Sequence, residues 1–145
     1  MNKILIVDDE LNMRLVLAAM LKKEGYEVSS AADGAEALAI MKSGEIDAVI
    51  SDLKMPNIDG MELLERISDK YPEVPVVMIT AHGTVATAVE ALKKGALDYI
   101  TKPFDIDELK NVISKAIKTR VLKESELFIP PEEIERGGII GTSKN

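Results

Sequence analysis

The chain has no cysteine and no tryptophan, and its 145 residues include a single histidine, His82. The absence of cysteine excludes disulfides, thiol nucleophiles, iron–sulfur clusters and cysteine-ligated zinc. One histidine excludes histidine-rich zinc sites and makes any serine–histidine–aspartate triad depend on His82. The available chemistry is therefore that of carboxylates, hydroxyls, lysines and backbone groups.

Long apolar runs and basic clusters are also missing. No run approaches the ~18 residues of a membrane span, and residues 4–7 are too short for a signal-peptide core. The 25 acidic side chains outnumber the 18 basic ones, for a net charge of −7. Because nucleic-acid surfaces depend on clustered Lys and Arg, we expect none on this segment. We expect a cytoplasmic protein that does not bind membranes.

Short β-branched runs alternate with longer stretches of helical period, which is typical of βαβ units around a parallel sheet. Strands are predicted at residues 3–7, 27–31, 48–51, 76–80 and 98–101. Helices are predicted at residues 10–24, 34–43, 60–70, 84–94 and 106–118. N-terminal caps are predicted at Asp9, Asp33, Thr84 and Asp105, and left-handed C-terminal glycines at Gly25, Gly44 and Gly95.

Polar side chains stand where the predicted strands end, and five of them are Asp8, Asp9, Asp52, Thr80 and Lys102. In an open parallel sheet, sites form beyond the carboxyl ends of the strands, where the strand order reverses. We therefore expect these side chains to converge.

Three carboxylates in one cleft destabilise one another, by roughly 4 kcal/mol per pair at ~4 Å and an effective dielectric near 20. They must protonate, pair with a base or bind a cation. Oxygen ligands without His or Cys select Mg²⁺, with Mn²⁺ as an alternative. The positive charge of Lys102 and the hydroxyl of Thr80 complete a set that suits a phosphoryl group.

The sequence resembles the receiver domain of two-component response regulators over about residues 2–120. The resemblance is carried by four motifs in order: Asp8-Asp9, Asp52-Leu53-Lys54-Met55-Pro56 with Asp59-Gly60, Thr80-Ala81, and Lys102-Pro103-Phe104. It implies an α/β fold of the flavodoxin-like (βα)5 class, a doubly wound parallel sheet with strand order 2-1-3-4-5.

The resemblance also implies roles for the acidic residues. Asp52 is the phospho-acceptor and attacks phosphorus as a nucleophile. Asp9, Asp52 and the backbone carbonyl of Lys54 bind Mg²⁺ directly, while Asp8 acts mainly through a coordinated water.

Further roles concern the phosphoryl group. Lys102 pairs with its oxygens, Thr80 donates its hydroxyl, and the amides of Lys54 and Ala81 assist. The Lys102-Pro103 peptide is expected to be cis, which only about 5–6% of X-Pro bonds are.

In the family, the threonine and an aromatic residue act as a switch, here Thr80 and Tyr99. Their movement would change the surface formed by the predicted helix 84–94, strand 98–101 and helix 106–118. Tyr99 is otherwise simply a half-buried strand residue. Lys54 and His82, each two residues after a site residue, are candidates for tuning the lifetime of the acyl phosphate; the alternative for His82 is a solvent-facing loop residue.

Partner surfaces follow from apolar stripes and from the resemblance. Met13 and Val16 lie on a second apolar stripe of the first predicted helix. This stripe either widens the core or binds a histidine kinase, and in the second case the loop at Lys102–Phe104 also contacts the kinase. A homodimer is expected through the surface of residues 84–94, 98–101 and 106–118. The last helix continues through Val121 and Leu122, as a frayed tail or a short dimer contact.

We expect the chain to divide into a receiver at residues 1–120, a linker at 121–138 that begins as helix, and a segment at 139–145. The segment Ile139-Ile140-Gly141-Thr142-Ser143 resembles the opening of the ATPase module of sigma-54-dependent transcription activators, and residues 80–83 and 98–105 resemble their nitrogen-regulatory subgroup. Because the chain lacks a GxxxxGK phosphate loop, ATP hydrolysis, DNA binding and polymerase contact would belong to other domains.

The sequence thus predicts a phosphorylation switch of a two-component system, not an enzyme beyond its own phosphoryl uptake and autodephosphorylation. Aspartyl-nucleophile phosphatases, the first alternative, carry a DxD motif on the first strand, whereas here the acids are adjacent. A flavodoxin-like electron carrier is the second, although Asp8-Asp9-Glu10 would repel a flavin phosphate.

Overall fold

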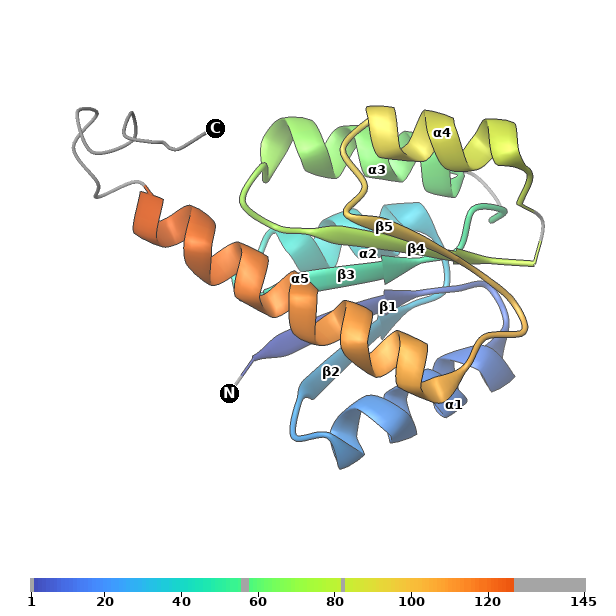
Figure 1. Ribbon diagram of the computed structural model, residues 1–145, viewed down its shortest axis with the longest axis horizontal. Helices are drawn as coiled ribbons and strands as arrows, with labels where there is room; N and C mark the ends of the chain where they lie inside the picture. Colours follow the sequence, from blue (N-terminus) through green and yellow to red (C-terminus); the bar gives the residue numbers. More distant parts are fainter. Residues whose placement is uncertain (1, 56–57, 82, 127–145) are drawn as a thin grey trace, which may run out of the picture.

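Five parallel strands form one sheet in the order β2-β1-β3-β4-β5 in the computed structural model, which describes residues 2–55, 58–81 and 83–126 (Figure 1). The strands are β1 (Lys3–Val7), β2 (Glu27–Ala31), β3 (Ala48–Ser51), β4 (Val76–Thr80) and β5 (Asp98–Thr101). The helices are α1 (Leu11–Lys23), α2 (Gly34–Met41), α3 (Gly60–Lys70), α4 (Val85–Lys93) and α5 (Ile106–Glu126). The predicted fold class and strand order are confirmed.

Helices cover both faces of the sheet, α1 and α5 on one and α2, α3 and α4 on the other (Figure 1). Successive residues of β1 therefore enter different cores: Leu5 packs with Leu64 of α3, and Ile6 packs with Leu17 of α1. This two-sided burial explains the unbroken apolar runs in the strands. Each fully buried Leu or Ile contributes about 1.5–3 kcal/mol relative to an exposed one.

The pairing of β1 with β3 sets the position of two acids. Val7 lies opposite Ser51, and the amide of Asp52 donates to the carbonyl of Val7 at 2.9 Å. The residues that follow, Asp8 and Asp52, therefore leave the sheet side by side. Because β2 lies on the other side of β1, the strand order reverses between β1 and β3, as the site prediction required.

Most predicted helix ends are confirmed. The side chains of Asp33, Thr84 and Asp105 accept the amides of Glu36, Thr87 and Asp107 respectively. Gly25, Gly44 and Gly95 have φ of 95°, 76° and 110°.

The predicted cap at Asp9 is wrong. The N-cap of α1 is Glu10, which has extended backbone and no side-chain cap bond. The helix begins at Leu11, one residue later than expected, and Asp9 lies in a bend before it. Asp8 accepts the amide of Glu10 instead, at 2.9 Å.

Candidate functional site

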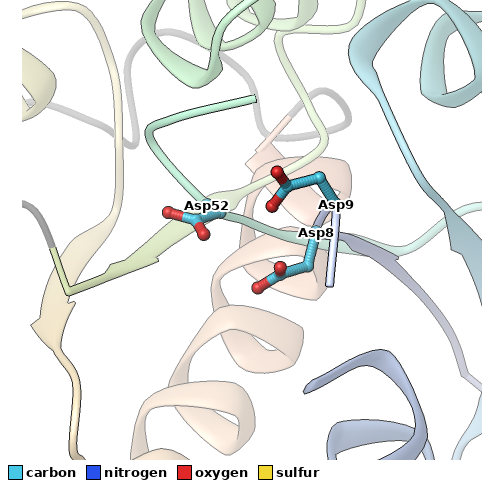
Figure 2. A group of neighbouring side chains, drawn as sticks. All are labelled: Asp8, Asp9 and Asp52. Atoms are coloured by element: carbon cyan, nitrogen blue, oxygen red, sulfur yellow. The ribbon is translucent and has the colours of Figure 1, made fainter. Parts of the chain in front are cut away.

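Asp8, Asp9 and Asp52 converge beyond the ends of β1 and β3 (Figure 2). Each offers a carboxylate oxygen, and the three oxygens lie within 4.8 Å of one another. Asp8 and Asp52 are 2% and 5% exposed, whereas Asp9 is exposed to solvent. The sequence-based expectation of an acidic cluster at this edge agrees with this geometry.

Lys102 reaches the cluster from the far side of β4. Its Nζ lies 2.9 Å from Oδ2 of Asp8 and 3.2 Å from Oδ2 of Asp52, and its side chain is 10% exposed. Burial lowers the pKa of the Lys102 ammonium, but the hydrogen bond to Asp8 and the charges of Asp52 and Asp8 outweigh it, so the pKa is raised above 10.5. The peptide between Lys102 and Pro103 is cis, as predicted.

Every polar group of Asp8, in its backbone and its side chain, makes a hydrogen bond. Its amide donates to the carbonyl of Ala31, and its Oδ1 and Oδ2 accept from the amide of Glu10 and from Lys102. Nη1 of Arg14, in α1, donates to its carbonyl oxygen at 2.7 Å. Sequence reasoning missed Arg14, because a basic residue in the first half of a helix carries no signal that it turns back to the preceding strand.

Asp52 is oriented by its neighbours in the chain. Its Oδ1 accepts from the amide of Leu53 at 2.6 Å and lies 3.4 Å from the amide of Lys54, while its Oδ2 faces Lys102. The buried hydroxyl of Ser51 donates to its carbonyl oxygen. The Lys54 amide thus lies beside the Asp52 carboxylate, and the Lys54 side chain is exposed.

The Asp59-Gly60 pair places the start of α3 against Asp52. Asp59 caps α3 through the amide of Glu62, and the amide of Gly60 donates to the carbonyl of Leu53 at 2.7 Å. A Cβ on Gly60 would lie 2.0 Å from the carbonyl oxygen of Asp52. Glycine is therefore required for this close approach.

The threonine and aromatic of the predicted switch lie on β4 and β5. Thr80 is fully buried and lies opposite Thr101, and its carbonyl accepts the amide of Lys102 at 2.9 Å. Tyr99 is half-buried, with its hydroxyl 3.0 Å from Oγ1 of Thr87. Ala81 is exposed next to Thr80, while His82 lies outside the described residues.

The donor set fits a hard divalent cation. It consists of carboxylate oxygens, with no nitrogen or sulfur ligand among the three clustered residues. When all three carboxylates are ionised, Lys102 neutralises only one of their negative charges. The two negative charges that remain match the charge of a divalent cation.

Apolar side chains are exposed on α1 and α4. On α1, Val16 is 51% exposed, whereas Met13 is half-buried and packs against the core below α1 and α5. Phe104, after Lys102, packs on the same core. On α4, Val85 is 83% exposed and Leu92 is 49% exposed.

The end of the described chain is helical. α5 continues past residue 118 and through the predicted extension at Val121 and Leu122 to Glu126, and its last turns project past the sheet (Figure 1). The tail motif at residues 139–145 and most of the predicted linker lie outside the described residues. In the described part of the chain, no helix has the length and apolar character needed to cross a membrane.

Two curated relatives match nearly the whole chain. A putative NtrX-like response regulator of Rickettsia bellii is 40% identical over 142 residues, covering 97% of this chain and 30% of its own. The transcriptional regulatory protein ZraR of Klebsiella oxytoca is 40% identical over 140 residues, covering 97% of this chain and 31% of its own. The chain therefore spans less than a third of either relative's length.

The comparison of structures and of family models agrees. The crystal structure of the receiver domain of NtrX from Brucella abortus is 42% identical, with a TM-score of 0.76 over 80% of this chain and 98% of that one. Receiver domains are signalling domains that interact with histidine kinases and bind Mg²⁺ at an acidic pocket. Residues 4–114 match the model of the response regulator receiver domain, and the chain belongs to that family.

Proposed function

We propose that this chain is a phosphorylation-dependent switch in which Asp52 accepts a phosphoryl group from a histidine kinase or a small phosphodonor. The observation that carries the proposal is the position of the buried Asp52 carboxylate, 3.2 Å from Lys102 and within 4.8 Å of two other acids. Few structural roles need so many like charges together, because their repulsion must be offset.

The chemistry is a transfer between two nucleophiles. An oxygen of Asp52 attacks phosphorus in line, and the new O–P bond forms as the N–P bond to the donor histidine breaks, leaving that imidazole as the leaving group. The ammonium of Lys102, whose pKa the hydrogen bond to Asp8 and the charge of Asp52 raise, would neutralise phosphoryl oxygens. The Thr80 hydroxyl and the amides of Lys54 and Ala81 are proposed as hydrogen-bond donors to the same oxygens.

Asp9, Asp52 and the carbonyl of Lys54 would hold Mg²⁺, which supplies charge neutralisation when it is bound. The exposure of the Asp9 side chain, within the cluster, supports direct binding of the metal by its carboxylate. Asp8, whose two oxygens accept from the amide of Glu10 and from Lys102, is proposed to act through a coordinated water, as the resemblance implies. Mn²⁺ satisfies the same oxygen ligands.

The phosphoryl charge then acts on a two-state surface. We propose that Thr80 and Tyr99 transmit it to the surface of α4, β5 and α5, which also forms the homodimer. The exposed side chain of Lys54, beside the acceptor, and His82 tune how long the acyl phosphate survives. The chain turns over no other substrate in this account.

The rest of the signalling pathway is proposed from the relatives and motifs. The kinase docks on α1, through Met13 and Val16, and on the loop Lys102–Phe104, in the cytoplasm. Residues 1–120 are the receiver, 121–138 the linker and 139–145 the start of an ATPase module in a sigma-54-dependent activator. The names of the relatives, a transcriptional regulatory protein and an NtrX-like response regulator, support this context. DNA and RNA polymerase contacts belong to other domains.

The test is phosphoryl uptake from phosphoramidate with Mg²⁺. Asp52→Asn should abolish stoichiometric uptake, because it removes the nucleophile and keeps its shape. Asp59→Asn is the matched control: Asp59 lies outside the cluster and caps α3, a role that Asn can keep. Unchanged uptake by Asp52→Asn would refute the proposal.

A further inference from the structure

The hydroxyl of Thr87 joins the start of α4 to Tyr99 of β5. Its Oγ1 accepts the amide of Thr84 at 2.8 Å and donates to the carbonyl of Thr84 at 3.0 Å. The Tyr99 hydroxyl lies 3.0 Å from the same oxygen. The Thr87 hydroxyl therefore contacts the backbone of Thr84 and the Tyr99 hydroxyl at the same time.

Thr87 is also part of the capping box of α4. The side chain of Thr84 accepts the amide of Thr87 at 3.1 Å, so the two threonines satisfy each other's backbone groups. One side chain therefore fixes both the first turn of α4 and the hydroxyl of Tyr99. Neither Thr84 nor Thr87 belongs to the four motifs that carry the resemblance.

Tyr99 lies directly on the loop between the site and α4. A Cβ on Gly83 would lie 2.1 Å from the Tyr99 hydroxyl oxygen, so the ring leaves no space above that residue. Gly83 follows Thr80 by three residues, and the carbonyl of Thr80 accepts the amide of Lys102. Tyr99 therefore contacts Gly83, between Thr80 and the start of α4.

A cleft of about 410 Å³ lies between the residues that follow Asp52 and α4. Its lining includes Leu53 and Lys54 on one side and Thr87 and Glu90 on the other. Thr87 thus lines the cleft, and its hydroxyl contacts that of Tyr99. The start of α4 has room to shift when the loop around Asp52 changes.

We propose that Thr87 is a positioning residue that holds the Tyr99 hydroxyl and couples phosphorylation of Asp52 to the first turn of α4. The inference rests on the proposed function and names the contact through which phosphorylation of Asp52 would reach α4. Movement of the loop after Thr80 either breaks the bond between Thr87 and Tyr99 or carries Thr87 with the ring, and both alter the capping box.

A purely local capping role gives a different expectation. A cap stabilises α4 whether or not residue 99 has a hydroxyl, whereas a positioning role requires that hydroxyl. The two roles are separated by a double-mutant cycle of Thr87→Val, which keeps the shape and loses the hydroxyl, with Tyr99→Phe. Thr87→Ser keeps the hydroxyl and is the conservative rescue.

The readout is the change in backbone amide chemical shifts when Mg²⁺ and beryllofluoride, a phosphoryl mimic, are added to the 145-residue chain. Wild type should respond at Leu53 and Lys54, which report occupancy, and at Ala88 and Val89 in α4. Thr87→Val and Tyr99→Phe should each lose most of the α4 response while keeping the response at Leu53. The double variant should lose no more than either, and Thr87→Ser should respond as wild type does.

A full α4 response in Thr87→Val, or losses that add in the double variant, would overturn the inference. If Thr87→Val does not fold, the α4 responses of Tyr99→Phe and Thr87→Ser are compared instead. An undiminished α4 response in Tyr99→Phe then overturns the inference. Wild type that responds at Leu53 and not in α4 also overturns it, with the proposed function intact. Wild type that fails to respond at Leu53 and Lys54 contradicts the proposed function itself.

Discussion

Lys102 Nζ lies 3.2 Å from Oδ2 of Asp52, although fifty positions separate the two residues in the chain. β4 lies between the strands that carry them, so the lysine side chain crosses the end of β4 to reach β3. The contact brings the proposed nucleophile and a charged ammonium together before any phosphoryl group arrives. It therefore links the topology of the sheet to the proposed chemistry.

Lys102→Met should separate metal binding from phosphoryl uptake. Removal of one positive charge from the cluster should raise Mg²⁺ affinity by about tenfold, since the acids then lack their counter-charge. Binding of beryllofluoride should fall, because its fluorines lose that same charge. Isothermal titration measures both, with Lys110→Met, on the exposed side of α5, as the control. A parallel loss of Mg²⁺ and beryllofluoride binding would contradict this role.

Asp9→Asn should stabilise the metal-free chain and remove its response to Mg²⁺. The substitution relieves repulsion among the three carboxylates, and we expect a gain of about 1 kcal/mol in the free energy of unfolding in EDTA. In wild type, Mg²⁺ at ten times its Kd should add about 1.4 kcal/mol.

Urea unfolding with EDTA and with Mg²⁺ gives both values for Asp9→Asn. Asp69→Asn, an exposed acid near the end of α3, should leave both unchanged. Destabilisation of Asp9→Asn in EDTA would show that the acids are not in mutual repulsion.

Gly60→Ala should destabilise the chain by about 3 kcal/mol and weaken beryllofluoride binding. The added Cβ would meet the Asp52 carbonyl, which is backbone and cannot move without displacing the acceptor. Gly25→Ala is the matched control, because its φ is 95° and no heavy atom lies within 4 Å of the new Cβ. It should cost about 1 kcal/mol and leave binding intact. Equal binding by the two variants would contradict the account.

Val85→Glu should weaken self-association by about tenfold, which corresponds to ~1.4 kcal/mol, if α4 contributes to the homodimer. Val85 is 83% exposed, so the change removes apolar surface without disturbing the core. Leu11→Glu, 58% exposed on α1, is the control for an added charge on the opposite layer. Analytical ultracentrifugation with and without beryllofluoride gives the dissociation constants, and a dimer weakened by Leu11→Glu instead would place the interface on α1.

The strands β1, β3 and β4 were predictable because each is a short run dominated by β-branched and apolar residues with polar residues at its end. The acid cluster followed from the same pattern, since parallel strands bring their carboxyl ends to one edge. The start of α1 was misplaced because Asp9 is a good capping residue by type. Asp9 instead lies in a bend before the helix, and its carboxylate lies in the acid cluster.

Three contacts could not be predicted, for the same physical reason. The bonds of Arg14 to Asp8, Ser51 to Asp52 and Thr87 to Tyr99 depend on the direction of a single side chain. Strand and helix patterns give the face on which a residue lies but not the rotamer that it adopts. Arg and Thr are also common on exposed helix surfaces, so their type alone indicates nothing.

The most direct test of the central claim is chemical mapping of the phosphorylated residue. The chain is incubated with acetyl phosphate and Mg²⁺, reduced with borohydride, which converts an aspartyl phosphate to homoserine, and digested for peptide sequencing by mass spectrometry. The account predicts homoserine at position 52 alone, and none when EDTA replaces Mg²⁺. Homoserine at position 8 or 9, or modification that persists in EDTA, would contradict it.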